Sequence, residues 1–236
     1  MFAGRAGRRR SSKDEAEKPF WISFADLMTA LMVLFLVVMG VALLAVTKNV
    51  SEREKREEQH RKDIELLMDR FEQAAIKYPG IKVDRERHVI DFGDRARFEF
   101  GKSTLTREQE GVLRQFVPEI LVKANDDLGK RILKRIVVEG YTDKQGTYLS
   151  NLNLSLQRSE RVLCSMFVRD GLNLLTADQK EQVRNLFLVG GYSFNAAKDT
   201  DEESRRVEMR LEFLGVFESR PEAPTSNGNF GDCALP

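Results

Sequence analysis

The pattern of hydrophobic and polar positions divides the chain into five stretches. Residues 1–19 are polar and rich in arginine, and residues 20–46 form an apolar run. Residues 47–80 start almost entirely polar and continue with apolar positions at helical spacing. Residues 81–217 alternate between strand-like and helical patterns, and residues 218–236 are rich in turn-forming residues. We therefore expect an N-terminal tail, an apolar helix, a helical connector, a folded domain and an extended C-terminal tail.

The apolar run 20–46 is long enough to cross a membrane. As a helix it extends about 40 Å, more than the ~30 Å hydrocarbon core of a bilayer. The apolar part of a signal peptide is usually shorter, about 7–15 residues, and ends at a cleavage site. This run instead leads into a charged stretch, so we expect a retained transmembrane helix. Six lysines and arginines lie on each side of it, so charge does not set its orientation.

Asp26 is the charged residue of this run. A carboxylate at membrane depth is costly and usually faces protein or water, where it serves function. A carboxyl group that can be neutral or charged is what a proton relay needs. Ser23 and Thr29 lie three residues to either side and extend Asp26 into a polar stripe on one helix face. The alternative is that Asp26 lies near the membrane surface and its charge simply reaches water.

In the connector, apolar residues from Ile64 to Tyr78 follow the i, i+3, i+4, i+7 spacing of one helix face. Pro79 and Gly80 end this helix. Three interpretations stay open: a helix packed on the following domain, a coiled coil between two copies, or a plug that blocks ion flow.

The folded domain alternates strands and helices, which predicts an α+β or α/β fold with one sheet. Thr106 is a candidate N-cap with Gln109 at the capping-box position, and Thr176 is a second candidate cap. Strands are expected at 83–92, 135–140, 186–190 and 207–213, with a short alternating run at 97–100; helices are expected at 104–122, 151–169 and 176–185.

The apolar helix resembles the transmembrane helix of MotB-type stator subunits. The resemblance rests on an aromatic-rich start at Trp21 and on the sequence ADLMTALM at 25–32, followed by a Phe/Leu/Val run. It implies that Asp26 carries the coupling ion, a proton, without a cofactor; sodium is the alternative ion. It also implies a homodimer inside a ring of MotA- or ZorA-like multi-span subunits, about five per complex.

The segment GYTDKQGTYLSNLNLSLQR, residues 140–158, resembles the loop and helix of OmpA-like peptidoglycan-binding domains. The Arg-Arg-Val-Glu sequence at 205–208 matches a family strand. Ser204 stands where the family usually has Asn, and the proline that usually follows the Gly190-Gly191 turn is missing. The resemblance covers roughly residues 83–215. It implies an α+β domain with a mixed sheet covered by helices. The matching positions in the loop and helix are Gly140, Thr142, Asp143, Gly146, Asn151, Leu154, Ser155 and Arg158.

The resemblance implies a peptidoglycan ligand, the diaminopimelate of the peptide stem, which carries ammonium and carboxylate groups. Asp143 can pair the ammonium, and Arg158 can take a carboxylate through two hydrogen bonds. Asn151, Leu154 and Arg158 share one helix face, and Arg206 is a candidate member of the cluster. Alternatively, Asp143 caps the loop and Arg158 pairs with a neighbouring acid.

Wall binding requires the domain to be periplasmic, which makes residues 1–19 cytoplasmic and the protein a single-pass inner-membrane protein. An oxidising compartment permits a Cys164–Cys233 disulfide; two free thiols are the alternative.

A net charge of +1 does not suggest a nucleic-acid partner. The sequence carries no catalytic triad, phosphate loop or metal motif, so we do not expect an enzyme. The compact chain is more similar to the MotB-like subunits of Zorya-type anti-phage defence systems than to flagellar MotB. The alternatives are a flagellar stator subunit and a passive peptidoglycan tether.

Overall fold

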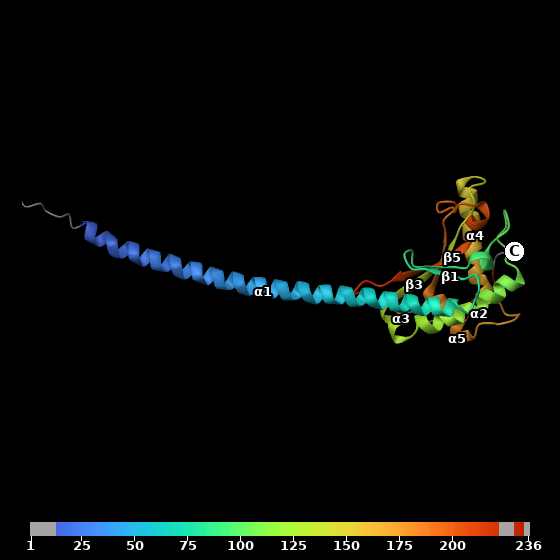
Figure 1. Ribbon diagram of the computed structural model, residues 1–236, viewed down its shortest axis with the longest axis horizontal. Coiled ribbons are helices and arrows are strands. Elements are labelled where there is room, and N and C mark those ends of the chain that lie inside the picture. Colours follow the sequence, from blue (N-terminus) through green and yellow to red (C-terminus); the bar gives the residue numbers. More distant parts are fainter. Residues whose placement is uncertain (1–12, 222–228, 234–236) are drawn as a thin grey trace, which may run out of the picture. The chain divides into compact units, whose positions relative to one another are not determined.

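The computed structural model describes residues 13–221 and 229–233. The expected N-terminal tail therefore lies mostly outside the described residues, as do parts of the C-terminal tail. Two compact units divide the chain, residues 1–56 and residues 57–236. The long helix α1 (Lys13–Ala75) contributes to both units (Figure 1).

The first part of α1 contains a segment that is long and apolar enough to cross a membrane. Its large apolar side chains between Leu27 and Val46 are 48–74% exposed. A helix that is apolar on every side is stable in lipid or in a protein core. Because these side chains find no cover in the described part of the chain, the segment has the character of a membrane span.

The second unit contains a five-stranded mixed sheet in the order β1-β2-β5-β3-β4. Only the β3–β4 pair is parallel; the other neighbouring strands are antiparallel. The strands are β1 (Lys82–Asp84), β2 (Val89–Asp91), β3 (Leu133–Gly140), β4 (Phe187–Gly191) and β5 (Val207–Phe213).

The helices of this unit begin at recognisable caps. Thr106 and Thr176 both form capping boxes, with Gln109 and Gln179 respectively, as the sequence spacing indicated for Thr106. The helical elements after α1 are η1 (Gly93–Ala96), α2 (Arg107–Ala124), α3 (Asp127–Ile132), α4 (Tyr148–Phe167), α5 (Ala177–Leu186) and α6 (Asp201–Ser204).

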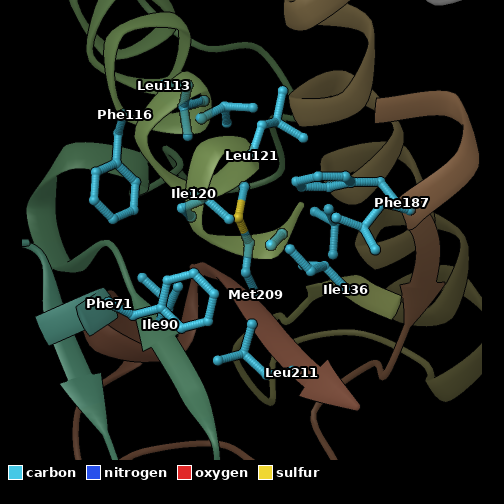
Figure 2. Packing of buried hydrophobic residues seen from close by; sticks show 14 of the residues in the cluster. Phe71, Ile90, Leu113, Phe116, Ile120, Leu121, Ile136, Phe187, Met209 and Leu211 are labelled. Carbon is cyan, nitrogen blue, oxygen red and sulfur yellow. The ribbon is translucent and has the colours of Figure 1, made fainter. Parts of the chain in front are cut away.

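One hydrophobic core joins the sheet to these helices. Figure 2 shows Ile136, Phe187 and Met209, from three strands, in the same cluster as Phe116 and Ile120 of α2. Along β5 the buried apolar residues alternate with polar ones, so one sheet face is apolar and the other is charged. The apolar face is the one that the helices cover.

The last turns of α1 belong to this core. Leu67, Met68 and Phe71 are 0–2% exposed, and Phe71 points into the cluster of Figure 2. Around them, Arg131 donates to Asp63 at 2.8 Å. The apolar face predicted for the connector is therefore packed on the following domain. This is the first of the three interpretations.

The α+β fold class predicted from the sequence is confirmed, with a mixed sheet packed by helices and one long apolar N-terminal helix. The alternating run 97–100 forms no strand; it is irregular chain between η1 and α2. The short helices α3 and α6 were not predicted, because their 6 and 4 residues are too few for a periodic pattern.

Candidate functional site

The candidate proton site lies on the exposed first part of α1. Ser23, Asp26 and Thr29 are all exposed, and the Thr29 hydroxyl donates to the carbonyl oxygens of Ala25 and Asp26, each at 2.8 Å. The hydrogen-bond donor of Thr29 is therefore used by the backbone of the preceding turn. Among the side chains that the structure describes, none pairs with the Asp26 carboxyl group.

The candidate wall-binding site is built on the loop between β3 and α4. A Cβ atom at Gly140 would lie 1.9 Å from the carbonyl oxygen of Ser155, so the strand and helix approach more closely than any side chain permits. Gly146 has φ +97°, a left-handed conformation that favours glycine. Thr147 then caps α4 by accepting from the Ser150 amide. These contacts fix the loop that carries Asp143.

Asp143 is 3% exposed and holds two partners. Its carboxylate accepts from the backbone amide of Gln145 at 3.1 Å and from Arg205 Nη1 at 3.2 Å. It thus caps the loop, as one interpretation of the sequence held, and also faces a cation. Beside it, the buried Thr142 hydroxyl has no hydrogen-bond partner among the described residues.

Arg158 is fully buried in the middle of α4. Its three nitrogens donate to the carbonyl oxygens of Lys102 (3.0 Å), Tyr141 (2.7 Å) and Glu99 (3.2 Å). The guanidinium also lies 5.1 Å from the centre of the Phe98 ring. Carbonyl dipoles and the face of an aromatic ring therefore stabilise the positive charge. Through the same contacts the Arg158 side chain connects α4 to the end of β3 and to the 98–102 segment.

Burial lowers the pKa of the Arg158 guanidinium to about 10, because desolvation disfavours its charged form; Asp143 opposes this shift and Arg205 adds to it. The group is still charged at neutral pH. Its role in taking a carboxylate of the ligand stays a prediction.

Asn151 and Leu154 share the face of α4 that carries Arg158. Asn151 is 4% exposed and donates through Nδ2 to the Gln145 carbonyl oxygen at 2.8 Å, so it also braces the loop. Leu154 is half-buried. The structure therefore brings Asp143, Asn151 and Arg158 into one loop and helix.

Arg205, which the sequence reasoning passed over, is the cation that contacts Asp143. Arg206, which it selected, donates to Glu208 at 2.7 Å and lies 4.3 Å from the centre of the Tyr141 ring. The paired arginines marked the cluster, but both precede β5, so strand alternation in the sequence could not show which one reaches Asp143.

Cys164 and Cys233 form a disulfide with a Cα–Cα distance of 5.7 Å. It joins residues 229–233 to the second half of α4, where the rings of Phe167 and Phe230 lie 5.1 Å apart. Within the described part of 218–236, no helix or strand forms.

Two family models match the chain. Residues 5–50 match the model described as membrane MotB of the proton-channel complex MotA/MotB, and residues 97–190 match the OmpA family. The second match contains the loop and helix that carry Asp143, Asn151 and Arg158.

Solved structures include the periplasmic domain of MotB, at 14% identity and TM-score 0.37, covering 54% of this chain and 64% of that chain. The cell wall anchor of the T6SS from Pseudomonas aeruginosa matches at 18% identity and TM-score 0.37, covering 60% of this chain and 94% of the other.

A full-length relative is the Zorya protein ZorB of Escherichia coli O139:H28 (strain E24377A / ETEC). It is 46% identical over 226 residues, which cover 94% of this chain and 92% of the relative. With this identity over nearly the whole of both chains, and with MotB and OmpA matches at either end, the chain belongs to the ZorB family of MotB-like proteins with an OmpA-family domain.

Proposed function

We propose that the chain is the wall-anchored subunit of a proton-driven inner-membrane motor that serves a Zorya-type anti-phage defence. Membership of the ZorB family and the OmpA-family domain support a stator-like subunit anchored to the wall. Its relatives are MotB-, ZorB- and OmpA-type proteins, and the chain is not an enzyme. The proposal also includes a proton pathway through Asp26 and a multi-span partner subunit.

The single observation that carries the proton role is the polar stripe of α1. Asp26, with Ser23 and Thr29, lies exposed on a helix that is otherwise apolar where it enters the span. A charged carboxylate facing lipid is costly, so the stripe requires a protein or water-filled neighbour. A ring of MotA- or ZorA-like multi-span subunits, around two copies of this chain, would supply it. Binding and release of protons at Asp26 would then drive that ring.

The wall-anchoring role is supported by the OmpA-family loop and helix. Asp143 offers a carboxylate to the ammonium group of a diaminopimelate stem, and the buried Arg158 charge favours its carboxylate. Wall binding would require the domain to lie in the periplasm and residues 1–19 in the cytoplasm. Asn151 and Leu154 would complete the contact surface from α4.

Phage protection tests the proton role. In cells that carry the complete defence locus, Asp26→Asn should abolish protection, because an amide keeps the shape but cannot exchange a proton. The matched control is Asp199→Asn, the same chemical change at an exposed site of the domain. Full protection by an Asp26→Asn protein present at normal levels in the membrane would defeat the proton role.

Pelleting with purified sacculi tests the anchor. Asp143→Asn and Asn151→Ala should each weaken binding of the detergent-solubilised chain, and the Asn151/Leu154/Arg158 triple alanine variant should abolish it. The two single variants are needed because loss of the buried Arg158 also destabilises the fold. Undiminished binding by all three variants would defeat the site assignment.

A flagellar stator and a passive tether are the alternative functions. Neighbouring flagellar or chemotaxis genes would favour the first, whereas helicase or nuclease genes would support defence. A passive tether would retain its function without the Asp26 carboxyl group.

A further inference from the structure

A polar cavity of about 410 Å³ lies in the second unit, between the β1–β2 strands, η1 and the segment that leads into β5. Four cationic side chains line it, and we call it the cationic cavity. Its lining consists of Lys82, Arg97, Lys198 and Arg206, the acids Asp91, Asp94 and Glu203, and Gly80 and Gly93.

Two glycines shape one wall of the cationic cavity. Gly80 and Gly93 have φ +97° and +51°, in the left-handed region. A Cβ atom at Gly93 would lie 2.7 Å from the Gly80 carbonyl oxygen, so the two turns touch backbone to backbone. The wall is therefore held in place by contacts that leave no room for side chains.

Buried acids hold two of the cations. Lys198 Nζ lies 2.6 Å from Asp91, and Arg206 donates to Glu208 at 2.7 Å. Asp91, Glu208 and Glu139 are direct neighbours across three adjacent strands. Burial raises the pKa of Asp91, but the hydrogen bonds from Lys198 and the Gly93 amide outweigh this and the net pKa is lowered. Asp91 is thus charged at neutral pH, and Asp91 and Glu208 hold Lys198 and Arg206 on the polar sheet face.

The other two cations have donor capacity to spare. Lys82 is exposed on the edge strand β1 and has no polar partner among the described residues. Arg97 pairs through its terminal nitrogens with Asp94 (2.6 Å) and Glu202 (3.2 Å), but its buried Nε finds no hydrogen-bond partner within residues 13–221 and 229–233. An anion in the cavity would meet the ammonium group of Lys82, and the Arg97 side chain lines the same cavity.

The cationic cavity adjoins the candidate wall-binding site, because two pairs of consecutive residues, Arg97–Phe98 and Arg205–Arg206, contribute one residue to each. The Phe98 amide donates to the Arg205 carbonyl oxygen at 2.9 Å. On one side of this backbone pair Arg205 contacts Asp143 and Phe98 lies against Arg158; on the other, Arg97 and Arg206 line the cavity. The two sites are therefore separated by a single backbone pair.

We propose that the cationic cavity is a second subsite of the wall-binding surface and takes a carboxylate group of the bound peptidoglycan. The inference rests on the proposed wall binding and adds to it a second recognition point, with Lys82 as the accessible charge. Peptidoglycan stems carry several carboxylates, so engagement of two of them at separate points favours the polymer over a free amino acid.

The test uses the detergent-solubilised full chain with two probes, purified sacculi and inorganic phosphate. Lys82→Glu should raise the amount of sacculi needed for half-maximal binding by about three- to tenfold, the size expected for one partly exposed charge contact. Lys82→Arg should bind as the unmodified chain does. Lys130→Glu, the same charge reversal at an exposed site on α3, is the matched control and should have no effect.

Equal sacculus binding by Lys82→Glu and Lys130→Glu would overturn the proposal. Phosphate binding that Lys82→Glu abolishes, with sacculus binding unchanged, would show a site for a free anion and would also overturn it. If the unmodified chain failed to bind sacculi, the proposed wall binding itself would fail, which this design separates from failure of the second subsite.

Discussion

The two parts of helix α1 differ in what surrounds them. Between Leu27 and Val46 the large apolar side chains are 48–74% exposed, whereas Leu67 and Phe71 are fully buried. Both parts are one continuous helix. The second part is completed by its own domain, and the first needs lipid and partner subunits.

The same contrast holds for the polar groups of the two candidate sites. Arg158 has an acceptor for each of its three nitrogens inside the domain. Asp26 lies exposed on the span. The Arg158 side chain is thus satisfied within its own domain, whereas the proposed role of Asp26 requires other chains to complete its site.

The largest predicted effect is on the stability of the domain. It compares truncation of one apolar side chain in each part of α1. Phe71→Ala should destabilise the domain by about 3–5 kcal/mol, because it removes a buried ring and leaves a cavity. Val37→Ala, an apolar truncation in the exposed part, should leave the domain's denaturation midpoint unchanged. Denaturant titration of the solubilised chain, followed by near-UV circular dichroism, measures both. Similar shifts for the two variants would break the comparison.

The disulfide gives the next effect. Cys164 and Cys233 are 69 residues apart, so the bond restricts a long stretch of unfolded chain. Its loss in a Cys164→Ser/Cys233→Ser variant should cost about 2–4 kcal/mol. Reduction of the unmodified chain should produce the same shift, which separates loss of the bond from effects of the serines. An unchanged midpoint in both cases would show that the tail adds nothing to the domain.

The elements of the domain could be predicted from local signals. Capping boxes, strand alternation and the 140–158 loop and helix placed most helices and strands within a few residues. The connector's apolar face was visible, but its destination was not, because periodicity does not say whether a domain or another helix covers it. Arg205 was missed for a related reason: which of two adjacent arginines reaches Asp143 depends on how the segment between α6 and β5 packs beside the loop that carries Asp143, a long-range property.

A smaller effect is expected on the pH dependence of stability. It compares Asp91, which has hydrogen-bond partners inside the domain, with an exposed carboxylate. Hydrogen bonds from Lys198 and Gly93 outweigh burial and hold the pKa of Asp91 below its ordinary value of 3.8. Its charge therefore stabilises the fold at neutral pH, and this contribution disappears as the pH falls through the lowered pKa. Asp91→Asn should lower the melting temperature at pH 7, with a difference that shrinks below pH 3.8. Asp199→Asn should show no such trend. A difference that grows on acidification would contradict the assignment.

The most direct test of the account is proton flux through Asp26. The chain would be produced with a ZorA-like multi-span subunit, and cytoplasmic pH would be followed with a fluorescent reporter during phage challenge. We expect acidification with the unmodified chain and none with Asp26→Asn at the same membrane level. Equal acidification by the two proteins would contradict the assignment of Asp26 as the proton site.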